Sequence, residues 1–237
     1  MTPFAAGGLI AAGEGSRLAS LGRPKPLVEV AGVPLLARVL TNFEAAGIER
    51  VAIIFNEREA DCADYARSRF PALVRTIVLR TTRHSLESFR TILAVSPPGR
   101  LLVATVDIVC ATHDFAAFAL AAASAPEDET VLAVTPLVAD EKPLWVESDA
   151  AGRIRRVGGR SGNAVTAGIY AVSEGARAKT PPASLGRLRE YLAWLCGVGE
   201  PMRAVSIGKA VDVDRPEDVR LAESLLGGGT AAAEGAA

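Results

Sequence analysis

The feature that most constrains the fold is a regular alternation of short apolar segments with longer segments of helical spacing. The apolar segments have the length of buried strands, and the segments between them repeat apolar residues every three or four positions. The expected strands are residues 4–12, 50–55, 73–79, 101–106 and 130–135, and the expected helices are residues 34–46, 57–69, 85–95 and 113–123. Strands joined through helices pair in parallel. The alternation therefore predicts an α/β fold with a doubly wound, mostly parallel sheet and helices on both faces.

The pattern changes after residue 140. Short strand-like segments follow, joined by turns that contain Gly and Asp, and they indicate a small antiparallel flap added to the parallel sheet. These segments are residues 145–148, 153–157 and 164–172. A helix, a strand and a closing helix are expected next, at residues 185–195, 202–206 and 217–226. We expect one domain over residues 1–226 and a flexible Gly/Ala-rich tail over residues 227–237, which hold nothing large to bury.

Composition excludes several classes of protein. The 26 Lys and Arg residues balance 27 Asp and Glu residues, so a net charge of −1 gives no electrostatic attraction to nucleic acid. Cys62, Cys110 and Cys196 form neither a CxxC zinc pattern nor a disulfide framework, and they suit a reducing compartment. No apolar run reaches the ~20 residues that cross a bilayer, and the first residues lack the basic region of a secretory signal. We expect a cytoplasmic protein with neither nucleic-acid nor membrane partners.

A glycine-rich loop with two cations follows the first expected strand, in the sequence AAGEGSRL at residues 11–18. Gly13 and Gly15 permit positive φ and close backbone approach, so that successive N–H groups can surround an anion. Arg17 can bind phosphate oxygens with its planar guanidinium, and Lys25 supplies a point charge whose backbone is restricted by a proline on each side. The pattern predicts a triphosphate site in a solvent-facing loop.

Other interpretations of this loop are weaker. A P-loop requires GxxxxGK[ST], which is absent, and a dinucleotide fingerprint requires a third glycine where Leu18 stands. The plain structural alternative is a glycine-rich turn with solvated Arg and Lys, and the second, proline-bracketed cation argues against it. No Ser-His-Asp order, HExxH or GxSxG is present, so the sequence does not support hydrolase chemistry.

The long segment AAGEGSRLASLGRPKPLVEVAGVPLL at residues 11–36 resembles the signature of the nucleotidylyltransferases of the NDP-sugar pyrophosphorylase, or NTP transferase, superfamily. LLVATVDIV at 101–109 resembles the strand that ends in the metal-binding Asp of this family, with Val106 in place of the usual Gly. TAGIYAV at 166–172 resembles the segment that contacts the acceptor. VDVDRPEDVRLAESLL at 211–226 resembles the closing metal-binding strand and helix, in a form typical of cytidylyltransferases for inositol phosphate and related alcohol phosphates.

The resemblance implies a Rossmann-like enzyme that joins an NTP to a sugar phosphate or alcohol phosphate and releases pyrophosphate with the help of Mg²⁺. Arg17 would hold the departing phosphates, and Lys25 would bridge the α-phosphate and the acceptor phosphate. The implied nucleotide-binding residues are Ala11, Ala12, Gly13, Glu14, Gly15, Ser16, Thr82 and Ser85. The implied metal ligands are Asp107, Asp212 and Asp214, and the implied acceptor-binding residues are Thr166 and Gly168.

Several of these residues also have a purely structural alternative. Asp107 can cap a helix or form a buried ion pair, and Ser85 can cap the helix that begins with it. Asp214 stands three residues before Glu217, with a proline between them, which is the spacing of a capping box. Whether Asp212, Asp214 or both bind metal stays open. The segment Thr82–Ser85 lacks the common Gly-rich form of the family, so the base of the NTP also stays open.

Two other functions are consistent with the opening motif. One is a molybdenum-cofactor nucleotidyltransferase, which shares the motif, and the other is a nucleotide-binding regulatory subunit without turnover. A chain without catalysis has no physical need for two cations (Arg17, Lys25) and two carboxylates (Asp107, Asp212) in one cleft, so we favour the enzyme. The resemblance is compatible with a homodimer.

Overall fold

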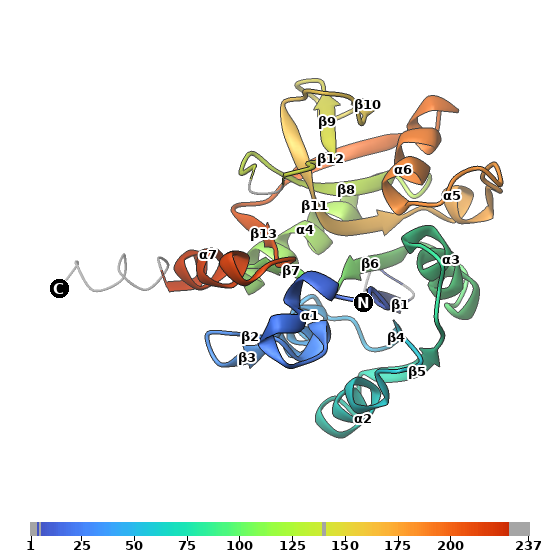
Figure 1. The fold of residues 1–237 in the computed structure, drawn as a ribbon. Coiled ribbons are helices and arrows are strands. Elements are labelled where there is room, and N and C mark those ends of the chain that lie inside the picture. Colours follow the sequence, from blue (N-terminus) through green and yellow to red (C-terminus); the bar gives the residue numbers. More distant parts are fainter. Residues whose placement is uncertain (1–3, 5, 139–140, 228–237) are drawn as a thin grey trace.

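A nine-stranded mixed sheet organises the residues described by the computed structural model, which are residue 4 and residues 6–138 and 141–227 (Figure 1). Its parallel half has the strand order β5 (Val74–Leu79), β4 (Val51–Phe55), β1 (Ala6–Ala11) and β6 (Leu101–Thr105). The chain runs outward from β1 to β5 and then crosses back to place β6 on the other side of β1. The strand order therefore reverses between β1 and β6, where the carboxyl ends of parallel strands leave a crevice for ligands.

The other half of the sheet is built on the long strand β11 (Ala164–Val172), which pairs antiparallel with β6. β8 (Thr130–Thr135) pairs with β11 and with β12 (Met202–Ser206). The hairpin of β9 (Trp145–Ser148) and β10 (Ile154–Val157) extends from the first residues of β11. The predicted α/β fold and the predicted antiparallel flap are thus both confirmed.

Helices cover both faces of the sheet, as Figure 1 shows, because alternate residues of each buried strand point to opposite sides. Leu9 and Ala11 of β1 belong to one core, and Ile10 belongs to the other. The first core is covered by α1 (Leu35–Ala45), α2 (Ala60–Arg69) and α4 (Thr112–Ser124). The second core is covered by α3 (Ser85–Val95), α5 (Glu174–Ala178) and α6 (Leu188–Gly197). The two faces therefore place different helix ends around the crevice.

A separate small layer closes the crevice near the C-terminal helix. β7 (Ile108–Cys110) follows β6 after two residues and pairs antiparallel with β13 (Ala210–Asp212). α7 (Pro216–Gly227) packs on this ribbon, on the 3₁₀ helix Ser16–Leu21 and near the hairpin of β2 (Glu29–Val30) and β3 (Val33–Pro34). A further 3₁₀ turn covers Lys25–Leu27. The ribbon brings the end of the chain beside the end of β6.

Most predicted elements have nearly the predicted bounds, and β8, β9, β11, β12 and α3 have those bounds to the residue. Two helices begin three residues later than predicted: α2 starts at Ala60 and α6 starts at Leu188. β2, β3, β7 and α5 were not predicted. Residues 228–237 of the predicted tail lie outside the described residues. Among the helices of the described part of the chain, none is long and apolar enough to cross a membrane.

Gly8 in β1 provides a test of the packing between the sheet and α3. A Cβ atom at Gly8 would lie 2.4 Å from Cγ2 of Ile92 and 3.4 Å from Cδ2 of Leu101. Both neighbours are buried, so we expect Gly8→Ala to lower the free energy of unfolding by about 1–3 kcal/mol in urea titrations. Gly197→Ala is the control, since a Cβ atom at Gly197 meets nothing within 4 Å. Equal stability of the two variants would contradict this packing.

Glu59, just before α2, provides a test by pH. Its Oε2 atom is buried and has no hydrogen-bond partner among the described residues, and burial raises the pKa of the carboxyl to about 7. A carboxyl whose pKa is raised by folding stabilises the protein below its unfolded pKa, and this stability is lost as the pH rises through the folded pKa. We therefore expect the free energy of unfolding of Glu59→Gln, relative to that of the wild type, to rise by about 1–2 kcal/mol between pH 5 and pH 8. Parallel urea titrations at both pH values measure it, and a difference that does not change with pH would refute the assignment.

Candidate active site

The loop after β1 folds back over Lys25. Gly15 has a φ of +58°, and a Cβ atom there would lie 2.6 Å from Cβ of Lys25, so that both conformation and space require glycine. A 3₁₀ helix begins at Ser16 and is closed by a hydrogen bond from the Leu18 N–H to the Gly15 carbonyl of 2.9 Å. The expected positive φ therefore holds at Gly15. Gly13 does not use this conformational freedom, since its φ is not positive and it has open space beside it.

Lys25 is held between two carboxylates at the edge of the crevice. Its Nζ atom lies 2.6 Å from Oδ2 of Asp107 and 2.5 Å from Oδ1 of Asp214. Burial alone would lower the pKa of Lys25, but the two carboxylates outweigh it and raise the pKa above its ordinary value. The expectation of a solvent-facing lysine is wrong, since Lys25 is only 8% exposed. The reason is the close crossing of Gly15, which covers the lysine stem.

The carboxylates reach this point from two distant strands. Asp107 follows β6 after one residue, and its carbonyl accepts a hydrogen bond of 2.9 Å from the Val213 N–H. Asp212 pairs with Ile108 in the β7–β13 ribbon. Burial alone would raise the pKa of Asp107, but the charge and hydrogen bond of Lys25 lower it, with a further hydrogen bond from Thr105. The two strand ends thus bring Asp107, Asp212 and Asp214 to one region.

Asp214 does not cap the last helix. The carboxylate of Asp218 accepts the N–H groups of Asp214 and Arg215 at 3.0 and 2.8 Å. The Asp214 side chain is directed instead to Lys25, and Nη1 of Arg17 lies 3.8 Å from its other oxygen. The capping alternative for Asp214 is therefore wrong, and the ion-pair alternative for Asp107 is observed.

The donor set of this region fits a hard divalent cation bound partly by its substrate. No group of three or more His, Cys, Asp or Glu side chains in the described residues is placed to hold a metal by itself. Mg²⁺ is commonly held by one or two carboxylates, with water and substrate phosphates completing its octahedron. Asp107 and Asp214 already share one ammonium group, so a site of two carboxylates is within reach of this arrangement.

The first cavity, of about 480 Å³, lies between the glycine-rich loop and the start of α3. Predicted nucleotide-binding residues line it, as does Lys25; they are Ala12, Gly13, Glu14, Gly15, Ser16, Thr82 and Ser85. Ala11 does not line it, because Ala11 is the residue of β1 that points into the core on the opposite face. Arg17 does not line it either, and its guanidinium stays more than half exposed beside Asp214. The Thr82 hydroxyl lies 2.7 Å from the Ser88 hydroxyl.

The second cavity, of about 320 Å³, lies under β11 and the start of α6. The predicted acceptor-binding residues Thr166 and Gly168 line it, where β11 shifts register between Thr166 and Tyr170. Gly168 has a φ of +66°, and a Cβ atom there would lie 2.7 Å from Oγ1 of Thr105. The Thr166 side chain acts on the Tyr170 hydroxyl as a hydrogen-bond partner that lowers its pKa, against the larger effect of burial, which raises it. The irregular strand thus opens space for a ligand at this position.

Two arginines of the second cavity were missed from the sequence. Arg187 and Arg189 line it from the start of α6, far along the chain from the glycine-rich loop. Nothing in the local sequence SLGRLRE separates them from arginines on any exposed helix face. Their position at the cavity becomes apparent only from the contact between the start of α6 and the start of α3.

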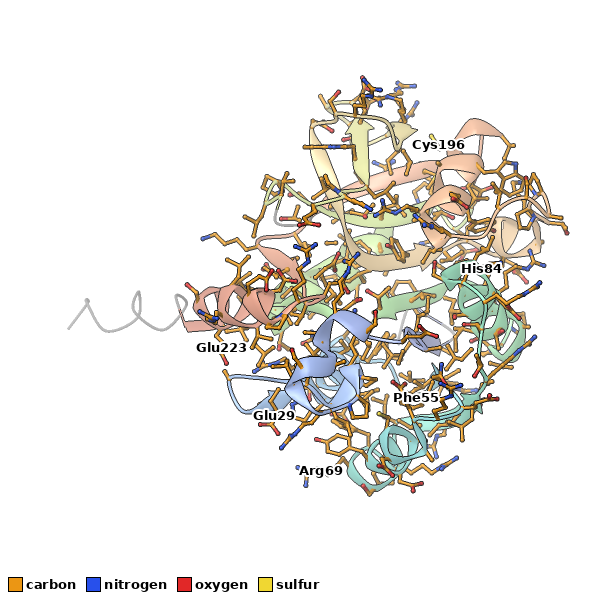
Figure 2. The ribbon with its side chains drawn as sticks, viewed as in Figure 1. Glu29, Phe55, Arg69, His84, Cys196 and Glu223 are labelled. Carbon is orange, nitrogen blue, oxygen red and sulfur yellow. The ribbon has the colours of Figure 1, made fainter. Side chains whose placement is uncertain are left out.

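The two cavities meet at a shared wall formed by Ser85, Thr105 and Asp107. The Leu188 N–H donates to the Ser85 hydroxyl at 3.0 Å. The Leu86 N–H donates to the Gly186 carbonyl at 3.1 Å. His84, labelled in Figure 2, lies at the start of α3, and a Cβ atom at Gly186 would come within 3.2 Å of its ring. Ser85 therefore joins the starts of α3 and α6 rather than capping its own helix.

Comparison with known proteins identifies the family. A family model described as the MobA-like NTP transferase domain matches residues 7–175. The chain belongs to this family. The predicted membership of the nucleotidyltransferase superfamily is confirmed, and the match includes the glycine-rich loop, Lys25, Asp107 and the irregular part of β11.

Individual relatives agree with the family assignment. The chain is 29% identical over 235 residues to a bifunctional IPC transferase and DIPP synthase of Rubrobacter xylanophilus, and the alignment covers 92% of this chain and 51% of that protein. It is 31% identical over 107 residues to a 2-aminoethylphosphonate cytidylyltransferase of Lancefieldella rimae, covering 43% of this chain and 42% of that protein. The chain thus spans about half the length of the curated relatives that it matches.

A solved structure confirms the fold. The inositol-1-phosphate CTP transferase of T. maritima superposes with a TM-score of 0.81 at 19% identity, covering 99% of this chain and 98% of that one. Agreement over nearly the whole of both chains includes the flap and the C-terminal ribbon.

The burial of Lys25 predicts a cost in stability when it is removed. Lys25→Ala leaves the partly buried Asp107 beside Asp214 without its cation, so we expect the free energy of unfolding to fall by about 1–3 kcal/mol without ligand. Urea titration measures this loss, and Lys209→Ala, at an exposed lysine, is the matched control. Unchanged stability of Lys25→Ala would show that the two carboxylates do not depend on the ammonium group.

Proposed function

We propose that this MobA-like domain transfers a nucleotidyl group from an NTP to the phosphate of a phosphorylated sugar or alcohol and releases pyrophosphate. The observation that carries the proposal is the shared wall between the two cavities at Ser85, Thr105 and Asp107. A triphosphate in the first cavity and an acceptor in the second would bring their phosphates together beside this wall. Lys25 lies there with its ammonium between two carboxylates.

The proposed reaction forms one bond and breaks one bond at the α-phosphorus. An oxygen of the acceptor phosphate bonds to the α-phosphorus, and the bond to the oxygen that bridges the α- and β-phosphates breaks. Pyrophosphate leaves with the electron pair of that bond. Such a transfer requires positioning and charge stabilisation more than covalent help from the protein.

Each residue of the site has a role that its chemistry suits. The N–H groups of the glycine-rich loop surround the triphosphate. Lys25 can exchange its carboxylate contacts for oxygens of the α-phosphate and the acceptor phosphate, since an ammonium group donates three hydrogen bonds. Arg17, exposed beside Asp214, is free to turn to the departing phosphates.

The carboxylates would hold the divalent cation of the reaction. Asp107, with Asp212 or Asp214, supplies the hard oxygen ligands, and we propose Mg²⁺ as the cation. When bound, it would offset the negative charge of the triphosphate and of the departing pyrophosphate.

The relatives suggest the nucleotide and the range of acceptors. One is named a cytidylyltransferase and the superposed structure a CTP transferase, so we propose CTP as the donor. Their names include an inositol phosphate and an aminoalkyl phosphonate, whose organic parts differ in charge because only the second bears an amine. A cytoplasmic location and a homodimer stay predictions.

A ligand panel tests the proposed function. We expect CTP with Mg²⁺ to raise the melting temperature more than UTP, GTP, dTTP or ATP, because a ligand at about 100 times its Kd adds roughly 2.7 kcal/mol. With CTP and a phosphorylated polyol, the wild type should release pyrophosphate. Asp107→Asn should lose at least about 100-fold of this turnover, whereas Asp64→Asn, on an exposed face of α2, should lose none.

Each unfavourable result of the panel points to a specific alternative. Stabilisation by a nucleotide without pyrophosphate release from any phosphorylated acceptor would favour the regulatory subunit. Preference for GTP and turnover with the molybdenum cofactor alone would favour the cofactor enzyme. If no nucleotide stabilises the protein, both the enzyme hypothesis and the hypothesis of a nucleotide-binding regulatory subunit are ruled out.

A further inference from the structure

The charges that line the second cavity come in two groups of opposite sign. The carboxylates Asp107 and Asp214 are both bound to Lys25, and Asp212 lies beside them on the same ribbon. The cations Arg187 and Arg189 come from the start of α6. A ligand in this cavity therefore meets carboxylates on the side of the C-terminal ribbon and guanidinium groups on the side of α6.

Neither arginine forms a direct ion pair with a carboxylate of the described residues, although the charge of Arg187 helps to lower the pKa of Glu190. In the described part of the chain, no Asp or Glu oxygen forms an ion pair within 4.0 Å of Arg187 or Arg189. Glu190, the nearest acid in sequence, accepts the N–H groups of Gly186 and Arg187 at 2.9 Å and so caps the helix. The positive charge of both guanidinium groups is thus available to a ligand.

Arg187 stands next to the shared wall of the two cavities. It directly precedes Leu188, whose N–H binds the Ser85 hydroxyl at 3.0 Å, and Ser85 lines both cavities. An acceptor whose phosphate reaches the α-phosphorus must place that phosphate at this wall. A guanidinium group binds a phosphate with paired hydrogen bonds, so Arg187 is placed to bind the acceptor phosphate.

Arg189 lies two residues after Arg187 and lines the same cavity. Its Nη2 atom donates to the Lys142 carbonyl at 2.7 Å, which fixes the guanidinium beneath the segment before β9. Burial and the negative charges of Asp212 and Asp107 raise the pKa of Tyr170, and the charge of Arg189 acts on that hydroxyl in the opposite direction. Arg189 lines the same cavity as Thr166 and Tyr170, which carry hydroxyl groups. The part of the cavity that these residues line would receive the alcohol portion of the acceptor.

We propose that Arg187 and Arg189 select the acceptor by charge, so that the second cavity takes a phosphorylated polyol with a neutral or anionic body and rejects one that bears an ammonium group. The inference rests on the proposed function and deepens it. Arg187 binds the phosphate that every acceptor carries, and Arg189 discriminates between alcohol portions. A guanidinium group donates hydrogen bonds to hydroxyl and anionic oxygens but repels an ammonium ion, and discrimination by such repulsion is common in specific sites.

Matched pairs of acceptors test the selection. Glucosamine 1-phosphate has an amino group in place of one hydroxyl group of glucose 1-phosphate. The same replacement relates 2-aminoethyl phosphate to 2-hydroxyethyl phosphate. Pyrophosphate release is measured for each with the NTP that most stabilises the protein, at a pH where the amine is protonated. We expect kcat/KM to be at least about tenfold higher for the hydroxyl member of a pair.

Variants separate the two arginines. Arg189→Met should reduce the preference within a pair to about threefold or less, and Arg187→Met should raise KM for both members by a similar factor of about ten. Arg160→Met, at an exposed arginine that does not line the cavity, should match the wild type in both respects. Stabilisation of each variant by the NTP shows that its first cavity is intact.

The outcomes distinguish the inference from the function on which it rests. A wild type that uses the ammonium-bearing member equally well or better, or a preference that survives in Arg189→Met, overturns the selection by charge and leaves the nucleotidyl transfer standing. If an NTP stabilises the protein but none of the four acceptors leads to release of pyrophosphate, the result counts against the nucleotidyl transfer itself. The inference then falls with the proposed function.

Discussion

The ammonium group of Lys25 between Asp107 and Asp214 is the interaction on which the site depends. It joins three segments that are far apart in the sequence, namely the turn after the glycine-rich loop, the end of β6 and the end of β13. A buried charge is tolerated only with partners of opposite charge, so these segments must assemble together. The short β7–β13 ribbon and the packing of α7 supply that assembly. The small layer at the end of the chain is therefore part of the site.

The elements of the sheet could be predicted because their strands are buried on both faces and read as continuous apolar runs. β8 and β11 are examples, and their bounds agree with the prediction. β7 and β13, with three residues each, are too short to give such a signal, and β13 was implied only by the resemblance at residues 211–226. They exist because they pair with each other across about a hundred residues, and no local pattern contains that information.

The candidate site likewise has a part that could be predicted from the sequence and a part that could not. The cations and carboxylates of the nucleotide half stand in ordered motifs, and the structure brings Lys25, Asp107 and Asp214 together as the resemblance implied. The alternative role of Asp214 as a helix cap was chemically reasonable, but Asp218 occupies that role one turn later. Arg187 and Arg189 had no local signal in the sequence, because their position at the cavity depends on where α6 begins relative to α3. Side-chain chemistry was visible in the sequence, whereas the partner of each side chain was set by tertiary contacts.

The hydrogen bond between Leu188 and Ser85 has a consequence for how such a protein can evolve. One hydroxyl group is part of the wall of both cavities and also fixes the start of α6 to the start of α3. A displacement of α6 that enlarged one binding space would move the boundary of the other. Divergence toward a new acceptor is therefore easier by exchange of side chains on a stationary helix than by movement of the backbone. Within such a lineage, the first turn of α6 should vary in residue type while its position stays constant.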